Sequence, residues 1–103
     1  MRGDVHELKA PRDARGHDQR GNRFAVVVQN DLLPLSTLLV APTSTSARPT
    51  SFRPEIEIEG KTTYVLAEQT AAVQAERLGR IVGHLSHTEM TAVDAALRTV
   101  LSV

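Results

Sequence analysis

The sequence predicts a small, mostly antiparallel β-barrel followed by one C-terminal helix. Several short runs, either rich in β-branched residues or alternating between apolar and polar, are separated by polar loops and turns. This is the pattern of a small all-β domain. From residue 86 onward the apolar residues change to helical spacing, directly after a helix-capping signal. With 103 residues the chain has room for one domain, 1–103.

Six segments carry a strand pattern. The strongest is FAVVVQN at 24–30, a continuous β-branched run that ends in Asn-Asp. The run TLLVAPT at 37–43 predicts a second buried strand, with Pro42 marking its end or a bulge. The predicted strands are 2–9, 24–30, 37–43, 52–58, 62–67 and 79–85, with polar loops at 10–23 and 44–51.

The second half of the chain predicts a hairpin and then a less regular stretch. Gly60-Lys61 fits a tight turn between the strands 52–58 and 62–67. The alternation of FRPEIEI directs three apolar side chains toward the core, Phe52, Ile56 and Ile58. Segment 70–78 is ambiguous and has room for one short helical turn.

The C-terminal segment carries the clearest helix pattern. Ser86 is a good N-cap, and Glu89 three residues later completes the S-x-x-E capping box. An apolar stripe at helical spacing follows, made of Met90, Val93, Leu97, Val100 and Leu101. A helix with one apolar stripe predicts packing against one face of the sheet.

Composition excludes several kinds of site. The chain has no cysteine, which rules out disulfides and thiolate metal sites. Its start, MRGDVHELKAPR, lacks the apolar stretch of a secretory signal, and no apolar run approaches the roughly 18 residues that span a bilayer. We therefore expect a soluble, cytoplasmic protein without membrane contact.

The net charge of +0 hides an asymmetry along the chain. Residues 1–53 carry eight Lys/Arg and five Asp/Glu, whereas residues 54–103 carry four and seven. Ten of the twelve cations are Arg, whose fork-shaped guanidinium suits phosphate oxygens. An Arg excess from a GC-rich coding sequence is an equally good explanation. Because only 3% of residues are aromatic, any nucleic-acid contact is expected to use phosphates and polar groups rather than base stacking.

The familiar catalytic signatures are absent, including GxSxG, HExxH and the P-loop. His84 and His87 have a spacing of three but no third ligand nearby in sequence, so solvated histidines are favoured over a metal site. Three glutamates alternate along one strand and predict a solvated face: Glu55, Glu57 and Glu59. We expect no metal and no cofactor.

One loop–strand arrangement remains as a candidate for chemistry. Arg23 lies where GHDQRGNR enters a strand, and Thr43 begins the Ser/Thr cluster at the end of another strand. A guanidinium beside hydroxyl donors would suit a phosphoryl group. Residue types and spacing alone favour a plainer interpretation, in which Arg23 is a surface charge and Thr43 merely ends a strand.

Over nearly its whole length the chain resembles the MazF/PemK toxins. The opening RGDV resembles the start of the family, and GHDQRGNRFAVVVQND resembles its G-x-x-Q-x-G-x-R-P-(aliphatic)-V-V-x-x-D segment. LVAPTSTS, FRPEIEI and VLAEQTAAVQAERLGRIVGHLS resemble the segments that follow, in the same order and with matching gaps. The resemblance implies an SH3-like, CcdB/PemK-like barrel.

The resemblance also implies a function. The family cuts single-stranded RNA without a metal, leaving a 2′,3′-cyclic phosphate and a 5′-hydroxyl, forms two-fold dimers, and is neutralised by an antitoxin peptide that occupies the RNA groove. The catalytic Arg and Thr of the family correspond to Arg23 and Thr43. Stabilising transition-state charge suits Arg23 better than acting as a base, because its pKa is very high. The residues expected to bind RNA and antitoxin are Arg12, Arg15, Gln19, Arg20, Ser44 and Gln69.

Two positions differ from the family pattern: Phe24 replaces the proline after the arginine, and His6 replaces an aromatic residue near the start. Phe24 fixes the backbone at the entry to the strand less firmly than proline would. Two rival functions stay open. One is a gyrase-binding toxin like CcdB, which shares the fold, and the other is an inactive relative that binds antitoxin only.

Overall fold

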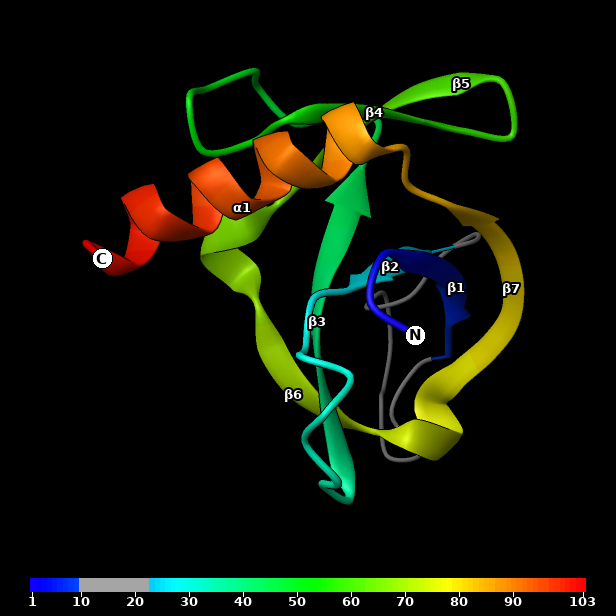
Figure 1. Cartoon of the computed structure of the whole chain (residues 1–103). Coiled ribbons are helices and arrows are strands. Elements are labelled where there is room, and N and C mark those ends of the chain that lie inside the picture. Colours follow the sequence, from blue (N-terminus) through cyan, green and yellow to red (C-terminus); the bar gives the residue numbers. More distant parts are fainter. Residues whose placement is uncertain (10–22) are drawn as a thin grey trace, which may run out of the picture.

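The computed structural model describes residues 1–9 and 23–103. Within these ranges the chain forms strands, two single-turn 3₁₀ helices (η1 and η2) and one α-helix (Figure 1). Their bounds, in chain order, are β1 Asp4–Leu8, β2 Phe24–Val27, β3 Thr37–Ser44, β4 Glu55–Ile58, β5 Lys61–Val65, η1 Ala67–Gln69, β6 Ala71–Gln74, η2 Ala75–Arg77, β7 Leu78–His84 and α1 His87–Leu101.

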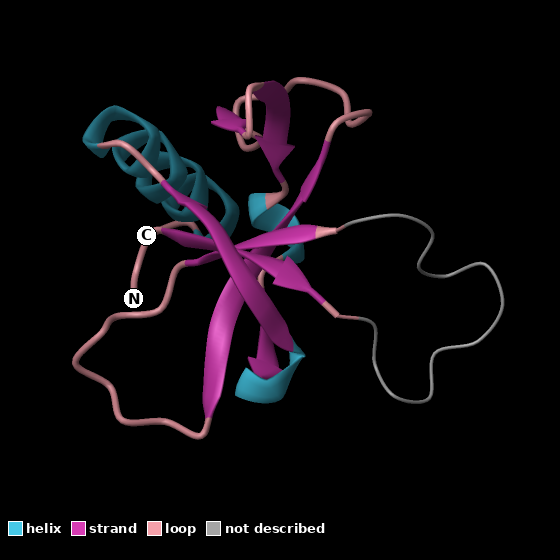
Figure 2. Ribbon diagram, turned by 90° about the vertical axis from the view of Figure 1, so that its right-hand side faces the viewer, coloured by secondary structure: helices cyan, strands magenta, loops and turns pink. Residues whose placement is uncertain are grey.

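The strands form one curled antiparallel sheet in the order β4-β5-β3-β2-β1-β7, with β6 also paired to β3. The long strand β3 is the centre of this arrangement. One of its edges pairs with β2, while the other pairs first with β6 and then, at Thr43 and Ser44, with β5. Figure 2 shows how steeply the strands cross as the sheet curls into a half-open barrel. The predicted mostly β fold with a C-terminal helix is confirmed.

Strand β2 is buried on both faces, which explains its continuous apolar sequence. Because successive side chains point to opposite faces, Val26 and Val28 enter one cluster and Ala25 and Val27 enter another. The first cluster is the main core beneath α1, and the second fills the inside of the curl against β3 and β6. Because β2 lies between the two clusters, packing on both of its faces fixes the position of its first residues.

Helix α1 covers the main core (Figures 1 and 2). The capping box is present as predicted: Ser86 Oγ accepts from Glu89 N at 3.1 Å, and Glu89 Oε1 accepts from Ser86 N at 2.9 Å. The other carboxylate oxygen of Glu89 accepts from Glu57 N on β4 at 2.9 Å. Val93 is fully buried, whereas Leu101, predicted on the apolar stripe, is 64% exposed because it lies past the part of the sheet that the helix covers.

Several predicted boundaries are corrected. Pro42 does not end its strand, because β3 continues through it to Ser44. The strand predicted at 52–58 begins only at Glu55, directly after Pro54, and Phe52 lies in a turn outside the core clusters. Ile56 and Ile58 are buried as predicted. The glutamates between and beside them are exposed as predicted, namely Glu55, Glu57 and Glu59.

The hairpin turn and the segment 70–78 also differ in part from expectation. The hairpin turn is Glu59-Gly60 rather than Gly60-Lys61, since Ile58 pairs with Lys61 and both turn residues have positive φ (50° and 80°). Those angles are typical of a two-residue hairpin turn. Segment 70–78 contains the predicted helical turn as η2, but also a strand, β6, that was not predicted.

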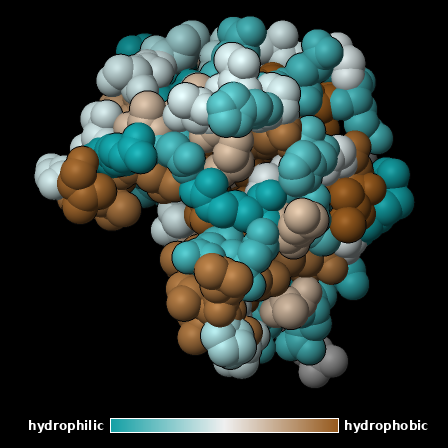
Figure 3. Space-filling view, viewed as in Figure 1, coloured by the Kyte–Doolittle hydropathy of each residue, from teal (hydrophilic) through white to brown (hydrophobic). Residues whose placement is uncertain are grey.

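Apolar side chains gather on the surface at the end of α1 and along the chain between β2 and β3 (Figure 3). The most exposed of them are Leu32, Leu35, Leu101 and Val103. A pocket of about 480 Å³ lies at this end of the helix, lined by residues that include Val28, Leu97, Arg98, Leu101 and Val103. In the described ranges, no helix has both the length and the apolar character needed to cross a membrane.

Candidate active site

A pocket of about 330 Å³ lies where β2 begins and β3 ends. Its position follows from the antiparallel pairing of the two strands, which sets Ala25 opposite Pro42 and so brings the residues before Ala25 beside those after Pro42. The lining residues are Arg23, Phe24, Thr43, Ser44, Thr45, Thr63, Leu66 and Gln69.

Arg23 supplies the positive charge of this pocket. Its side chain is exposed, but its backbone is fixed, because its carbonyl accepts a hydrogen bond from Leu8 N at 2.8 Å. The next residues are those of β2, which is buried on both faces. The guanidinium therefore projects from a rigid backbone toward solvent, where it can meet an anion without first breaking an ion pair in the described part of the chain.

Hydroxyl groups line the pocket next to Arg23. Thr43 is 9% exposed, and its Oγ1 donates to the Phe24 carbonyl at 3.2 Å, which ties the end of β3 to the start of β2. Ser44 is half-buried, and its Oγ accepts from Ser46 N at 3.2 Å, so its own proton is available to a ligand or to Ser46 Oγ. This strand end thus presents hydroxyl groups that can hydrogen-bond an oxyanion.

The opposite wall comes from η1 and β5. Leu66 N donates to the Pro42 carbonyl at 2.8 Å, and Gln69 N donates to the Leu66 carbonyl at 2.9 Å. The first bond attaches the start of η1 to β3, and the second closes the turn of η1. The Gln69 side chain is exposed at the pocket. Thr63 on β5 completes this wall and is buried. An amide beside an arginine offers both a donor and an acceptor to a base or a ribose.

The chemistry of this lining favours an anion. Among the described residues it contains one arginine, four hydroxyl side chains and one amide, and no carboxylate or imidazole. A positive charge surrounded by neutral donors attracts phosphate without electrostatic competition from an acid in the same wall.

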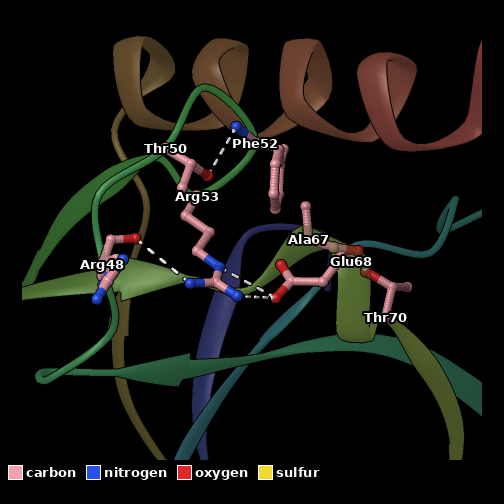
Figure 4. A network of polar contacts seen from close by, with 7 residues as sticks. All are labelled: Arg48, Thr50, Phe52, Arg53, Ala67, Glu68 and Thr70. Atoms are coloured by element: carbon pink, nitrogen blue, oxygen red, sulfur yellow. Dashed lines mark hydrogen bonds and ion pairs between the residues drawn. The ribbon is translucent and has the colours of Figure 1, made fainter.

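The nearest acid on η1, Glu68, is engaged elsewhere (Figure 4). Its Oε2 accepts from Arg53 Nε at 3.0 Å and from Arg53 Nη2 at 2.6 Å. The hydrogen bonds from Arg53 lower the pKa of Glu68, although partial burial opposes them. The same pairing raises the pKa of Arg53. Glu68 is therefore an anion held by Arg53 and is not among the residues that line the pocket.

Four of the residues selected from the sequence lie together in the pocket: Arg23, Thr43, Ser44 and Gln69. The other four lie outside the described residues: Arg12, Arg15, Gln19 and Arg20. Sequence reasoning did not select the other four lining residues, Phe24, Thr45, Thr63 and Leu66. Thr45 could have been found, because it continues the Ser/Thr cluster after Thr43, but Thr63 and Leu66 carry no distinguishing signal.

Away from the pocket, His84 pairs with an acid at the start of the chain. His84 Nδ1 lies 2.7 Å from Asp4 Oδ1, and the N-terminal ammonium lies 3.3 Å from Asp4 Oδ2. Burial raises the pKa of Asp4, but the bonds to His84 and the N-terminus outweigh it, so the pKa is lowered overall. Among residues 1–9 and 23–103, no three His, Cys, Asp or Glu side chains are grouped so that they could hold a metal ion.

Comparison with known proteins places the chain in a family. Residues 1–101 match the family described as PemK-like, MazF-like toxin of type II toxin–antitoxin system. A Mycobacterium tuberculosis protein, Rv3098A, which is named provisionally as a toxin, is 38% identical over 104 residues that cover 100% of this chain and 98% of that protein.

Solved structures agree with this fold. One is an endoribonuclease in complex with its cognate antitoxin from a mycobacterial species, with a TM-score of 0.82 and 19% identity over 100% of this chain and 95% of that one. Another is the Mycobacterium tuberculosis toxin MazF-mt6, with a TM-score of 0.79 and 17% identity over 97% of each chain. The sequence match over nearly the whole chain shows that this protein belongs to the PemK-like, MazF-like toxins of type II toxin–antitoxin systems.

Proposed function

We propose that the chain is a sequence-selective endoribonuclease toxin that cleaves single-stranded RNA without a metal ion. The observation that carries the proposal is the pocket in which Arg23 lies with the hydroxyls of Thr43 and Ser44. Membership of the toxin family supports it, as does the fold shared with a protein described as an endoribonuclease. The lining formed by residues 23–103 has none of the carboxylates or imidazoles that would bind a catalytic metal, which favours chemistry by side chains alone.

In the proposed reaction the ribose 2′-oxygen attacks the adjacent phosphorus and the bond to the 5′-oxygen breaks. The products are a 2′,3′-cyclic phosphate and a 5′-hydroxyl. One proton leaves the 2′-hydroxyl and another reaches the leaving oxygen, so no proton is gained or lost overall. Arg23 stabilises the extra negative charge on the phosphorane, which is the role that a permanently charged donor performs best.

Thr43 supplies a neutral hydrogen bond to a non-bridging oxygen. In the free protein its hydroxyl donates to the Phe24 carbonyl, so it must rotate about its Cβ–Oγ1 bond to donate to phosphate. Such a rotation is inexpensive compared with moving backbone. Ser44 and Gln69 line the same pocket and are proposed to contact the neighbouring nucleotide.

The partners proposed for this surface are single-stranded RNA and an acidic segment of a cognate antitoxin. Arg12, Arg15, Gln19 and Arg20 are proposed from the sequence as further contacts for both, because a phosphate backbone and an acidic peptide both attract guanidinium groups. Replacing the three arginines by glutamine should flatten the salt dependence of RNA binding. Unchanged affinity of the triple variant at low salt would remove this segment from the interface.

A homodimer in the cytoplasm completes the proposal. The exposed side chains of Leu101 and Val103 at the end of α1 border the pocket of about 480 Å³, so this surface carries both apolar projections and a hollow, with Arg2, Asp94 and Arg98 also in its lining. A two-fold interface uses the same patch on both copies, so a patch with both shapes suits self-association. Large exposed apolar patches on a small protein usually mark such contacts.

The test is cleavage of a labelled RNA by purified protein, with and without EDTA. We expect cleavage that EDTA leaves unchanged and products that carry a cyclic phosphate and a 5′-hydroxyl. Loss of activity in EDTA with recovery in magnesium would contradict metal independence. Absence of cleavage combined with inhibition of gyrase would favour a CcdB-like toxin, and antitoxin binding alone would favour an inactive relative.

A further inference from the structure

The loop that follows β3 and the turn that follows β5 meet at one ion pair (Figure 4). The loop begins at Thr45, in the pocket wall, and its far end carries Arg53. The turn is η1, which carries Glu68 next to Gln69 in the opposite wall. The Arg53–Glu68 pair therefore connects the two segments that form opposite sides of the pocket.

Arg53 is held in place by its own loop. Its backbone N donates to the Thr50 carbonyl at 3.1 Å, and its Nη1 donates to the Arg48 carbonyl at 3.4 Å. Its guanidinium lies 5.6 Å from the centre of the Phe52 ring, within the range of a cation–π contact. The loop therefore presents a guanidinium in a fixed direction instead of a mobile surface charge.

Arg53 compensates the negative charge of the partly buried Glu68 carboxylate. Only 27% of its side chain is exposed, and its Oε1 is buried without a hydrogen-bond partner in the described residues. Both bonds from Arg53 fall on the other oxygen. A partly buried carboxylate that loses its single charged partner is destabilised strongly, so without Arg53 η1 would move to expose it.

We infer that Arg53 and Glu68 form a positioning pair that holds η1, and with it Gln69, at a fixed distance from the β3 wall, and so determines how tightly RNA binds in the pocket. The inference rests on the proposed function. The hydrogen bonds from Arg53 also lower the pKa of Glu68, which makes the carboxylate a poor proton acceptor and supports positioning over acid–base chemistry.

The chemical step should be affected less than binding. Arg23 and Thr43 are fixed by other bonds, from Leu8 N to the Arg23 carbonyl and from Thr43 Oγ1 to the Phe24 carbonyl. Neither bond involves the loop or η1. Loss of the pair should therefore raise KM and leave kcat nearly unchanged.

The test compares Glu68→Gln and Arg53→Lys with Asp4→Asn. The Asp4–His84 pair is the control because Asp4, like Glu68, is a partly buried carboxylate (15% exposed) paired with a basic side chain, and neither Asp4 nor His84 lines either pocket. Cleavage gives KM and kcat, and anisotropy with an RNA carrying a 2′-deoxy group at the cut site gives Kd. Thermal melting reports folding, and the double variant Arg53→Glu/Glu68→Arg tests whether the pair can be rebuilt.

We expect Glu68→Gln to raise KM and Kd about tenfold with kcat within about threefold, as expected for weakening one charged hydrogen-bonded pair. Arg53→Lys should give a smaller effect in the same direction, and the reversed pair should recover part of the lost affinity. Asp4→Asn should leave KM and Kd within about twofold of wild type. A large fall in kcat with unchanged Kd, or equal changes of KM and Kd in Glu68→Gln and Asp4→Asn, would overturn the inference.

The cleavage and binding measurements also distinguish failure of this inference from failure of the proposed function. If the wild-type protein binds the deoxy-substituted RNA but does not cleave the normal one, the proposed nuclease activity is refuted. The Kd values of the variants would then still test the role of the Arg53–Glu68 pair in binding. Wild-type protein that neither binds nor cleaves RNA would refute both.

Discussion

Replacing Arg23 by alanine tests the central chemical claim most directly. The side chain is exposed, and the one backbone bond at this position, from Leu8 N to the Arg23 carbonyl, does not need it. The free energy of unfolding should therefore change by no more than about 0.5 kcal/mol. Activity should respond quite differently, because the variant removes the one formal charge that the described residues bring to the pocket lining.

The size of the loss follows from the surroundings of the guanidinium. Removing one preorganised donor to a developing oxyanion lowers the rate about 10² to 10³-fold, or roughly 2.7 to 4 kcal/mol. Because Arg23 is exposed, solvent screens part of its field, so we expect a value near the lower end, about a hundredfold.

The assay is single-turnover cleavage of a labelled RNA, which isolates the chemical step from product release. Arg80→Ala is the matched control, since it removes the same charge from a side chain that is 65% exposed on β7. Arg23→Ala that retains activity within a few-fold of wild type, with an unchanged circular dichroism spectrum, would refute the assignment. So would an equal loss in Arg80→Ala, because the effect would then be one of overall charge.

Three further outcomes are expected. Thr43→Ala should reduce cleavage less than the arginine variant, and should lower stability by about 1 kcal/mol in thermal melts, because the hydroxyl bond to Phe24 is lost; Thr43→Ser should restore both. Leu101→Asp should shift the protein toward monomer in light scattering with little change in melting temperature, since the side chain is 64% exposed; a dimer that persists would locate the interface elsewhere. Stability should fall as pH drops below the ordinary Asp value of about 3.9, because the pKa of Asp4 is lowered in the folded state and the unfolded chain takes up its proton first. Asp4→Asn should flatten that acid limb of the melting curve.

The sequence allowed the fold to be predicted where local signals agree with tertiary structure. The β2 run and the capping box of α1 are such cases, because burial on two faces and a helix start both leave a direct trace in residue order. Strand β6, in contrast, has no recognisable strand pattern in its sequence. Its sequence, AAVQ, has one residue of high β-propensity, and it is a strand because it pairs with the free edge of β3.

The pocket was predictable in part for the same reason. Arg23 and Thr43 stand at the ends of two strongly patterned strands and match positions of the family motif, so they could be selected before the pairing of those strands was known. Leu66 and Thr63 could not be selected, because their place in the wall depends on the crossing of β5 over the end of β3. The Arg53–Glu68 pair joins two turns 15 residues apart, and no periodicity links such positions.

The two oxygens of Glu89 have a consequence for how this protein behaves at high concentration. One oxygen caps the helix, while the other occupies a backbone N–H of β4, the outermost strand at its end of the sheet. A vacant N–H on an outer strand is a point where another chain can add its own strand and start an aggregate. The carboxylate that caps α1 therefore also blocks the addition of a strand at this edge of the sheet. Protein in which that carboxylate is lost would be expected to come out of solution sooner than its melting temperature alone would suggest.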